Sequence, residues 1–509
     1  MNRLLVPLVA LMVACPAAKI SAQAPRLVVM LTVEGFRTDL LEATAEEHLS
    51  KVLEKDHTLL YTNIQHPLLK ADAVSSVAIL HTGTTAAQNG IPARNPVIRD
   101  AQGRISSHQS VFSDPDYIGY ATADRLSPLT LTSATISDKI KSTTLGLGLV
   151  FSIAPNAEEA IVGGGQNADG VFWIDNNSGK WASSAYYYKS GKPWYVDKLV
   201  SPIAMLDKGL IWAPLYEANY SAQYETLAPY PTKQPFSYPL NRQFGGILEF
   251  KQTPLINEEV TKLAIAVIKS ASLGNDKSTD FLALHYTVDP AKGKSDLSPE
   301  VVDSYYRLYR EIEKLKEHMP EGAVLIISGD AMASERMDEV KAQRTFYTDR
   351  CLALTNMYLA AEYAQKGIVK EITEDGQLFL NQVDGVNTEE LETKVANFLL
   401  EFSGVQYALT NTELKRRSLT EESNRAWQTS LNISSHKHRG NVVFGILPGW
   451  AISSKDNVSQ TTSRRYAPVV SPLMIWGKTI AGGKEEAPLD LRLVSNTICH
   501  TLRIRPPTP

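Results

Sequence analysis

The chain has 509 residues, of which 51 are Lys or Arg and 55 are Asp or Glu, so its formal net charge is −4. Hydrophobic residues make up 43% and charged residues 21%, which excludes a disordered or fibrous chain. The slightly acidic balance provides no basic surface for a nucleic acid, so we expect no nucleic-acid partner. The length allows roughly two to four domains, although single α/β enzymes also reach this size.

The N-terminus has the pattern of a secretory signal peptide. Arg3 gives a positive start, an apolar run extends to Cys15, and small residues continue to Ala22. The run is too short for a permanent membrane anchor. We predict a signal peptide over 1–22, cleaved after Ala22, and a periplasmic or secreted mature chain of 23–509 without a transmembrane anchor. The alternative is a lipoprotein signal with Met-Val-Ala before Cys15, where Met fits poorly.

Several apolar runs predict the strands of a buried sheet. A continuous apolar run bounded by turn residues is typical of a strand that is covered on both faces. Between the runs, residues 299–318 place apolar side chains on one face of a helix. This alternation predicts an α/β fold with a doubly wound, mostly parallel central sheet flanked by helices. The runs are Leu27–Val33, Phe281–Leu284, Ala323–Ser328, Asn441–Leu447 and Leu473–Trp476.

Two segments depart from this pattern. Residues 162–240 are rich in Gly, Asn, Ser, Trp and Tyr, and we expect them to form a cap-like insertion of short strands and turns. Residues 373–414 combine a short apolar stretch, a turn and a helix, and we expect a second small insertion there.

Two cysteines, Cys351 and Cys499, follow the predicted signal peptide. In an exported protein they could form one disulfide or remain two buried thiols, and the sequence is compatible with both. Because the chain has no CxxC motif or Cys/His cluster, a structural zinc site is disfavoured.

Three acidic residues follow predicted strands. Glu34, Asp289 and Asp330 come directly after an apolar run or after a short turn. Ligands of open α/β sheets bind beyond the carboxyl ends of the strands, so these acids are the candidate functional residues. The nearby His81 and His285 lie in apolar segments and are interpreted as packed histidines rather than ligands.

Six motifs in the same order resemble segments of the alkaline phosphatase superfamily. The resemblance covers nearly the whole mature chain and is strongest to PafA-type bacterial alkaline phosphatases and nucleotide pyrophosphatase/phosphodiesterases. It implies the alkaline-phosphatase-like fold and a site where two zinc ions hold a phosphoryl group while a Thr or Ser attacks it. The motifs are LTVEGFRTDLL, AILHTGTTAAQNGIPARN, ADGVFWIDNNSGKWASSAYY, DLSPEVVDSYYRLYREIEKL, RGNVVFGILPGW and VSNTICHTLRIRPP.

The resemblance places the family's nucleophile on Ala73, which has no hydroxyl and cannot form a covalent phosphoenzyme. The histidine of the same motif falls on Val77. Ser75 and Ser76 are poor substitutes, because a shift of two or three helical residues rotates a side chain by roughly 200–300°.

The resemblance also places the family's metal ligands and phosphate-binding groups. The metal-binding acids fall on Glu34, Asp289 and Asp330. The three ligand histidines fall on Gly293, Ala331 and the neighbourhood of Thr461, so all three imidazoles are missing. The Lys-x-Arg pair that grips phosphate falls on Asn156 and Glu158, and the family's asparagine falls on Asn95 with one residue of slippage. Acidic and neutral side chains thus stand where relatives are cationic.

We therefore predict a pseudophosphatase that has lost phosphate-ester hydrolysis and binds an envelope protein partner or an anionic ligand in its old cleft. No cofactor is expected, and the three acids are interpreted as relics that could still hold one hard cation. The alternative is an active phosphomonoesterase or phosphodiesterase that uses one divalent metal (Zn, Mg or Ca) on Glu34, Asp289 and Asp330, with water as the nucleophile.

Overall fold

A computed structural model describes residues 24–44, 49, 51–69, 71–99, 105–106, 109–188, 209–219, 224, 234–240, 246–292, 295–335, 344–417, 425–435, 438–447, 450–454 and 465–507. The predicted signal peptide and Cys15 lie outside these residues. No helix in the described ranges is long and apolar enough to cross a membrane. Cys351 and Cys499 are both buried free thiols, so of the two expected arrangements the structure has the unpaired one.

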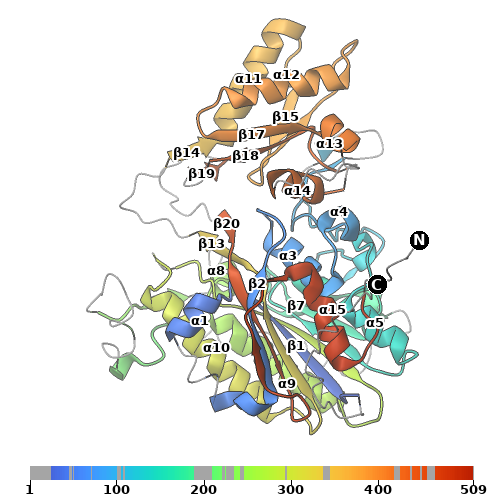
Figure 1. Cartoon of the computed structure of the whole chain (residues 1–509), viewed down its shortest axis with the longest axis vertical. Helices are drawn as coiled ribbons and strands as arrows, with labels where there is room; N and C mark the ends of the chain where they lie inside the picture. Colours follow the sequence, from blue (N-terminus) through green and yellow to red (C-terminus); the bar gives the residue numbers. More distant parts are fainter. Residues whose placement is uncertain are drawn as a thin grey trace, which may run out of the picture.

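A large twisted sheet forms the centre of the lower lobe in Figure 1. Its strand order is β22-β2-β21-β12-β1-β11-β6-β7-β8-β5, and β12, β1, β11, β6 and β7 are parallel neighbours. The predicted mostly parallel sheet is therefore confirmed. The strands are β1 (Leu27–Glu34), β2 (Thr58–Gln65), β5 (Gly119–Tyr120), β6 (Val150–Ile153), β7 (Gly170–Ile174), β8 (Trp181–Ser184), β11 (Asp280–Thr287), β12 (Val324–Gly329), β21 (Val470–Trp476) and β22 (Gly483–Glu485).

Helices cover both faces of this sheet, which explains why its central strands are apolar throughout. Alternate residues of β1 point to opposite faces: Leu27, Val29 and Leu31 join one core, and Val28 and Met30 join the other. The first core contains α1 (Thr38–Thr44), α8 (Gly246–Lys251), α9 (Leu255–Ser270) and α10 (Pro299–Glu317). The second contains α3 (Ala73–Thr82), α5 (Ile136–Thr143), α6 (Ala157–Gly164) and α15 (Leu491–Leu502).

Two of the predicted parallel strands pair differently. The run at 473–476 belongs to β21, which is antiparallel to both β12 and β2. The run at 441–447 contains β18 (Val442–Ile446), which lies outside the central sheet. A short buried strand has the same apolar pattern in either direction and in any sheet, so composition alone does not distinguish these cases.

A smaller lobe is built around β18. It has an antiparallel sheet of order β15-β16-β18-β17 with its own apolar core, and it lies above the main sheet in Figure 1. The expected insertion at 373–414 lies within this lobe, which also includes the preceding helix and β18. Its main elements are α11 (Thr348–Tyr363), β15 (Val369–Ile372), β16 (Gln377–Leu380), α12 (Thr388–Leu400), β17 (Val405–Thr410), α13 (Asn411–Arg417) and α14 (Arg425–Asn432).

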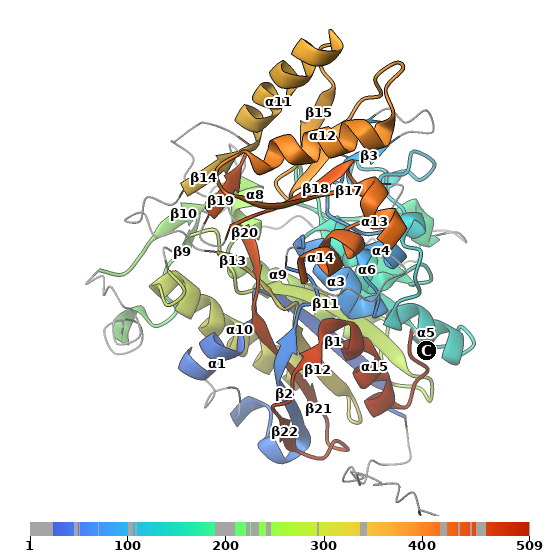
Figure 2. The same ribbon diagram turned by 45° about the horizontal axis from the view of Figure 1, so that its top comes forward.

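The small lobe contacts the main lobe through α14. The Leu69 N–H donates to Thr429 Oγ1 (2.9 Å), and Thr85 Oγ1 donates to Asn432 Oδ1 (2.9 Å). Thr85 precedes α4 (Ala86–Asn89), and both turned and unturned views place α14 beside α4 (Figure 2). These bonds fix one end of the small lobe near α3, which begins at Ala73.

The expected cap-like segment at 162–240 divides into two parts. Its first part extends the central sheet as β7 and β8, because the Gly170–Ile174 run is buried on both faces. Its described remainder includes a hairpin of β9 (Leu210–Trp212) and β10 (Tyr238–Leu240). Buried Asp303 of α10 anchors this hairpin by accepting from Trp212 Nε1 (2.8 Å) and the Leu215 N–H (2.7 Å).

Candidate functional site

The three predicted acids lie at one edge of the central sheet. Glu34 is the last residue of β1, Asp330 follows β12 directly, and Asp289 follows β11 by two residues. Because β12, β1 and β11 are adjacent and parallel, their carboxyl ends carry all three side chains to the same place. We call these residues the strand-end acids.

Backbone N–H groups hold the two most deeply buried strand-end acids. Asp330 Oδ1 accepts from the N–H groups of Gly35 (3.3 Å) and Met332 (3.2 Å), and Asp289 Oδ2 accepts from the Ser334 N–H (2.9 Å). Gly35 has φ +74°, and a Cβ there would lie 2.5 Å from Asp289 Cβ. Only glycine therefore lets the turn after β1 pass so close to Asp289.

Burial and mutual repulsion favour a protonated Asp330. Its side chain is fully buried, and burial, followed by the charge of Glu34, raises the pKa of Asp330 well above its usual range. Asp330 Oδ2 has no hydrogen-bond partner within the described part of the chain. A protonated carboxyl group binds a hard metal ion poorly, because it must first lose its proton.

Of the three positions where the resemblance predicts ligand histidines, one lies in the described residues. Ala331 is fully buried and has φ 55°, a left-handed conformation that costs a non-glycine residue about 1–2 kcal/mol. Gly293 and Thr461 lie outside the described residues. The backbone at Ala331 thus keeps a strained geometry of the kind found at functional sites, without a side chain that can bind metal.

Two buried histidines contact the second half of β1. His285 Nε2 is 3.9 Å from Glu34 Oε2, and neither ring nitrogen of His285 has a hydrogen-bond partner among the described residues. His81 Nε2 is 3.4 Å from Thr32 Oγ1. Burial, followed by the nearby His285, lowers the pKa of His81 to about 3, so this imidazole is neutral.

Ala73 is buried at the start of α3. Asp72 is the N-cap of α3 and accepts from the Val74 N–H (2.9 Å), which leaves Ala73 as the first helical residue. The Ala73 side chain is 3% exposed and has no group that could attack phosphorus. The sequence resemblance predicts the family's nucleophile at this residue.

The serines that follow Ala73 are buried. Ser76 is fully buried, and its Oγ is 3.1 Å from His66 Nε2. His66 Nδ1 is 3.0 Å from the Leu68 nitrogen and 3.2 Å from the Leu68 oxygen. Ser76 Oγ also donates to Asp72 O (3.2 Å), so its hydroxyl is held within α3, and Ser75 is equally buried.

Arg94, which the sequence analysis did not single out, forms an ion-pair cluster with Glu158 and Glu159. One Arg94 Nη donates to Glu158 Oε2 (2.7 Å), and the other donates to Glu159 Oε1. Burial alone would lower the pKa of Arg94, but the carboxylates of Glu159 and Glu158 outweigh it and raise the pKa well above its usual range. We call these three residues the Arg94 cluster.

Lys251, also missed from the sequence, supplies a buried amine next to Asn156. Lys251 Nζ donates to Ile174 O (2.5 Å), Asn176 Oδ1 (2.6 Å) and Asn156 Oδ1 (3.4 Å). Burial, followed by repulsion from Arg94, lowers the pKa of Lys251 to about 7. Asn156 itself precedes the first residue of α6 as its N-cap.

A polar cleft of about 930 Å³ joins these groups. The side chains of Glu34 and Asp289 line it on the strand side, whereas Asp330 lies buried behind them. Exposed Asn95, half-buried Asn156, the Arg94 guanidinium and Lys251 line it on the helix side. The sequence could not show this juxtaposition, because Arg94 contacts glutamates that are more than sixty residues away.

The donors in the cleft do not fit a pair of zinc ions. Zinc sites of this kind need several imidazoles together with carboxylates. Within the described ranges, His285 is the histidine with a close contact to a strand-end acid, at 3.9 Å from Glu34. Among the described residues, no group of three or more His, Cys, Asp or Glu side chains is arranged to hold a metal ion. We therefore derive no chemical step through a zinc pair.

Comparisons with known proteins identify relatives along almost the full chain. No family model matches it. A "calcium-transporting ATPase" of Myroides odoratus is 24% identical over 95% of this chain and 92% of its own length. Alkaline phosphatase PafA of Elizabethkingia meningoseptica is 23% identical with the same two coverages.

Solved structures share the fold. The crystal structure of wild-type alkaline phosphatase PafA has a TM-score of 0.77 and 20% identity, covering 95% of this chain and 97% of that one. An inactive threonine-to-alanine variant of murine ectonucleotide pyrophosphatase/phosphodiesterase 5, in complex with AMP, has a TM-score of 0.51 and 13% identity over 95% of this chain and 96% of that one. The resemblance in the sequence motifs is confirmed, and the chain belongs to the alkaline phosphatase superfamily.

Proposed function

We propose that this protein is an exported pseudophosphatase, which no longer hydrolyses phosphate esters and binds a protein partner or an anionic ligand in the cell envelope. The observation that carries the proposal is Ala73 at the first position of α3, where the family's nucleophile is expected. A methyl group there cannot attack phosphorus. The following Ser75 and Ser76 are buried, and Ser76 Oγ donates to Asp72 O (3.2 Å).

The helix side of the cleft supports the same proposal. Arg94 is neutralised by two carboxylates, and Glu158 stands where a phosphate-gripping arginine is expected. A phosphate dianion here would be repelled by Glu34, Asp289 and Glu158. Arg125 also lines the cleft and donates to Pro115 O (3.1 Å) rather than to a carboxylate, so it is the cation that a weakly held anion would meet. Lys251 is the remaining buried cationic group, and its pKa of about 7 makes its charge depend on pH.

Binding without turnover is compatible with this fold. The murine phosphodiesterase structure named above is an inactive threonine-to-alanine variant that holds AMP. A superfamily member that lacks its threonine can therefore still bind an anionic ligand, which is the kind of activity we propose for the cleft of this chain.

Assays on the purified mature protein test the proposal. We expect no turnover of aryl phosphate monoesters or diesters with Zn²⁺, Mg²⁺, Ca²⁺ or Mn²⁺ above that of a Glu34→Ala/Asp330→Ala control. Metal-dependent turnover that disappears in the control would contradict it. Affinity purification from the native envelope, followed by mass spectrometry, would then identify the partner.

A second candidate is hydrolysis by one divalent metal with water as the nucleophile. It is favoured by the convergence of the strand-end acids and by the buried Asp330 Oδ2, which has no hydrogen-bond partner in the described structure. Against it, Asp289 Oδ2 and Asp330 Oδ1 already accept backbone hydrogen bonds. The same assay separates the two functions.

Export has its own test. We propose that residues 1–22 are removed and that the mature chain is periplasmic or secreted. Mass spectrometry of the protein from its native source should give an N-terminus at Gln23. A lipid-modified N-terminus at Cys15 would support the lipoprotein alternative instead.

A further inference from the structure

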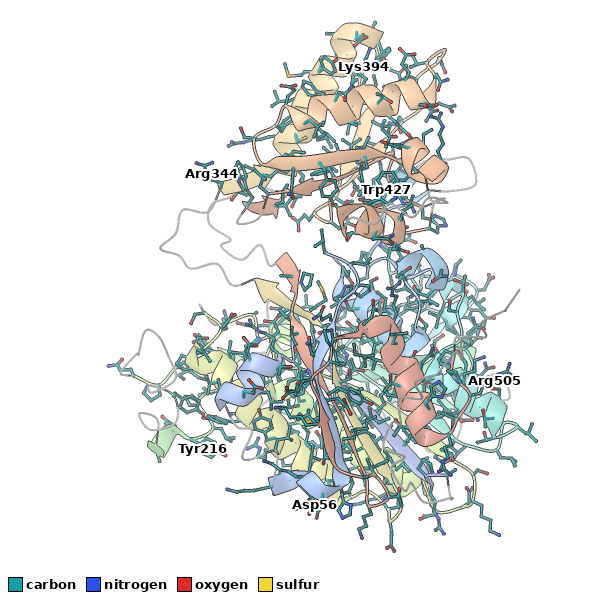
Figure 3. The ribbon with its side chains drawn as sticks, in the orientation of Figure 1. Asp56, Tyr216, Arg344, Lys394, Trp427 and Arg505 are labelled. Atoms are coloured by element: carbon teal, nitrogen blue, oxygen red, sulfur yellow. The ribbon has the colours of Figure 1, made fainter. Side chains whose placement is uncertain are left out.

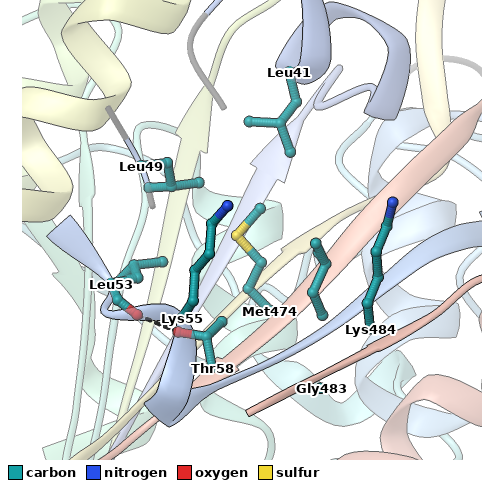
Figure 4. A pocket seen from close by; sticks show the side chains of 9 residues that line it. Leu41, Leu49, Leu53, Lys55, Thr58, Met474, Gly483 and Lys484 are labelled. Carbon is teal, nitrogen blue, oxygen red and sulfur yellow. Dashed lines mark hydrogen bonds between the residues drawn. The ribbon is translucent and has the colours of Figure 1, made fainter. Parts of the chain in front are cut away.

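A second cavity, of about 280 Å³, lies at the edge of the central sheet and shares no lining residue with the polar cleft. It is enclosed by α1, the 3-10 helix η1 (Lys55–His57), β2, β21 and β22 (Figure 4). Its size is near the lower end of the range for small-molecule pockets. No step of the proposed function uses it.

The wall of this cavity is apolar. It consists mainly of the side chains of Leu41, Leu49, Leu53, Leu60 and Met474, four of which are at most 4% exposed and belong to the main core. The one hydroxyl in the wall, that of Thr58, donates to Leu53 O, as the dashed line in Figure 4 shows. An apolar wall of this kind cannot satisfy a polar ligand but gains free energy by burying an alkyl chain.

Two lysines stand at the rim. Lys55 and Lys484 are the charged residues among those that line the cavity, and Figure 4 shows their side chains extending in the same direction on either side of Met474. Lys484 Nζ is 3.0 Å from Glu486 Oε1, but both side chains are at least half exposed. Such an exposed ion pair is weak, so an anion at the rim can compete for Lys484.

We propose that this cavity binds a fatty acid, with the alkyl chain against the leucines and the carboxylate between Lys55 and Lys484. The occupant must be apolar over the length of the cavity and anionic at one end, since the wall offers no hydrogen bonds and the rim offers two cations. A single-chain carboxylate has both properties.

Calorimetric titration with a series of saturated fatty acids, below their micellar concentrations, tests the proposal. Each added CH₂ should tighten binding about fourfold until the cavity is full, after which the affinity stays constant. Dodecyltrimethylammonium should bind at least about tenfold more weakly than dodecanoate, because its head group has the wrong charge. Equal affinity for the two probes, or no binding of either, would overturn the proposal.

Variants assign the binding to this cavity. Leu60→Trp should fill it and abolish binding, with circular dichroism to show that the variant is folded. Lys55→Gln/Lys484→Gln changes exposed residues only. It should lower the affinity for dodecanoate at least about tenfold and leave the affinity for dodecanol unchanged. Lys478→Gln, which alters an exposed lysine outside the cavity, is the matched control and should have no effect. Dodecanoate binding that is the same in all three variants would contradict the assignment.

Sedimentation with vesicles distinguishes a free fatty acid from a membrane lipid as the ligand of this cavity. We expect that replacing Lys55 and Lys484 does not change the amount of protein that sediments with phosphatidylglycerol vesicles. Lysine-dependent sedimentation by a protein that does not bind soluble dodecanoate would overturn the proposal in favour of a lipid surface.

Discussion

The strand-end acids and the Arg94 cluster are both sets of ionisable side chains beside one cleft, but different groups stabilise them. Asp289 and Asp330 accept hydrogen bonds from backbone N–H groups of adjoining turns. Glu158 and Glu159 are instead neutralised by the Arg94 side chain. A backbone donor remains after a carboxylate is replaced by an amide, whereas a charged partner is left buried and unpaired. The first region should therefore tolerate loss of charge, and the second should not. The distribution of side chains over both lobes is shown in Figure 3.

The largest expected effect is on the Arg94 cluster. Arg94→Met should lower the free energy of unfolding by about 3–5 kcal/mol at pH 7, because it leaves two carboxylates buried without a counter-charge. Urea denaturation measures this change. The triple variant Arg94→Met/Glu158→Gln/Glu159→Gln should recover most of the loss. A single variant as stable as the wild type would show that the cluster is not what holds this wall together.

Lys251 extends the comparison to a buried cation that is held by neutral oxygens. Its pKa is about 7 in the folded state and about 10.4 when unfolded, so the unfolded chain binds more protons between these values. The wild type should gain stability as the pH rises from 7 to 10, by a few kcal/mol. Lys251→Met should lack this gain, and its stability relative to the wild type should fall over the same range. Parallel urea curves at pH 6 and pH 10 test this, and a pH-independent difference would count against it.

Asp330 should make the free energy of unfolding change with pH in the opposite direction. Its folded pKa lies above the unfolded value of about 3.9, so the folded state holds the extra proton and the wild type loses stability as the pH rises above 4. Asp330→Asn has no such proton. Relative to the wild type, its free energy of unfolding should therefore rise between pH 4 and pH 8. Thermal unfolding at the two pH values measures it, and a relative loss would refute a protonated Asp330.

The smallest effect is expected at Asn95. Its side chain is exposed at the mouth of the cleft. Asn95→Ala should change the free energy of unfolding by less than about 0.5 kcal/mol. A larger loss in chemical denaturation would mean that Asn95 supports the cleft rather than only facing it.

The sequence predicted the parts of the fold and site that depend on local pattern. β1, β11 and β12 are apolar because both faces are covered, and the position of an acid directly after such a strand locates it at the sheet edge. The direction of β21 and the sheet that contains β18 depend on distant pairing, which the apolar pattern does not encode. Arg94 and Lys251 were missed for the same reason: each acquires its role from residues on other elements.

Metal binding by the mature protein tests most directly whether the strand-end acids are relics. The purified protein would be dialysed against Zn²⁺, Mg²⁺ or Ca²⁺, and bound metal would be measured by elemental analysis beside the Glu34→Ala/Asp330→Ala variant. The account predicts no stoichiometric metal and no difference between the two proteins. One or two equivalents of metal per chain that are lost in the variant would contradict it.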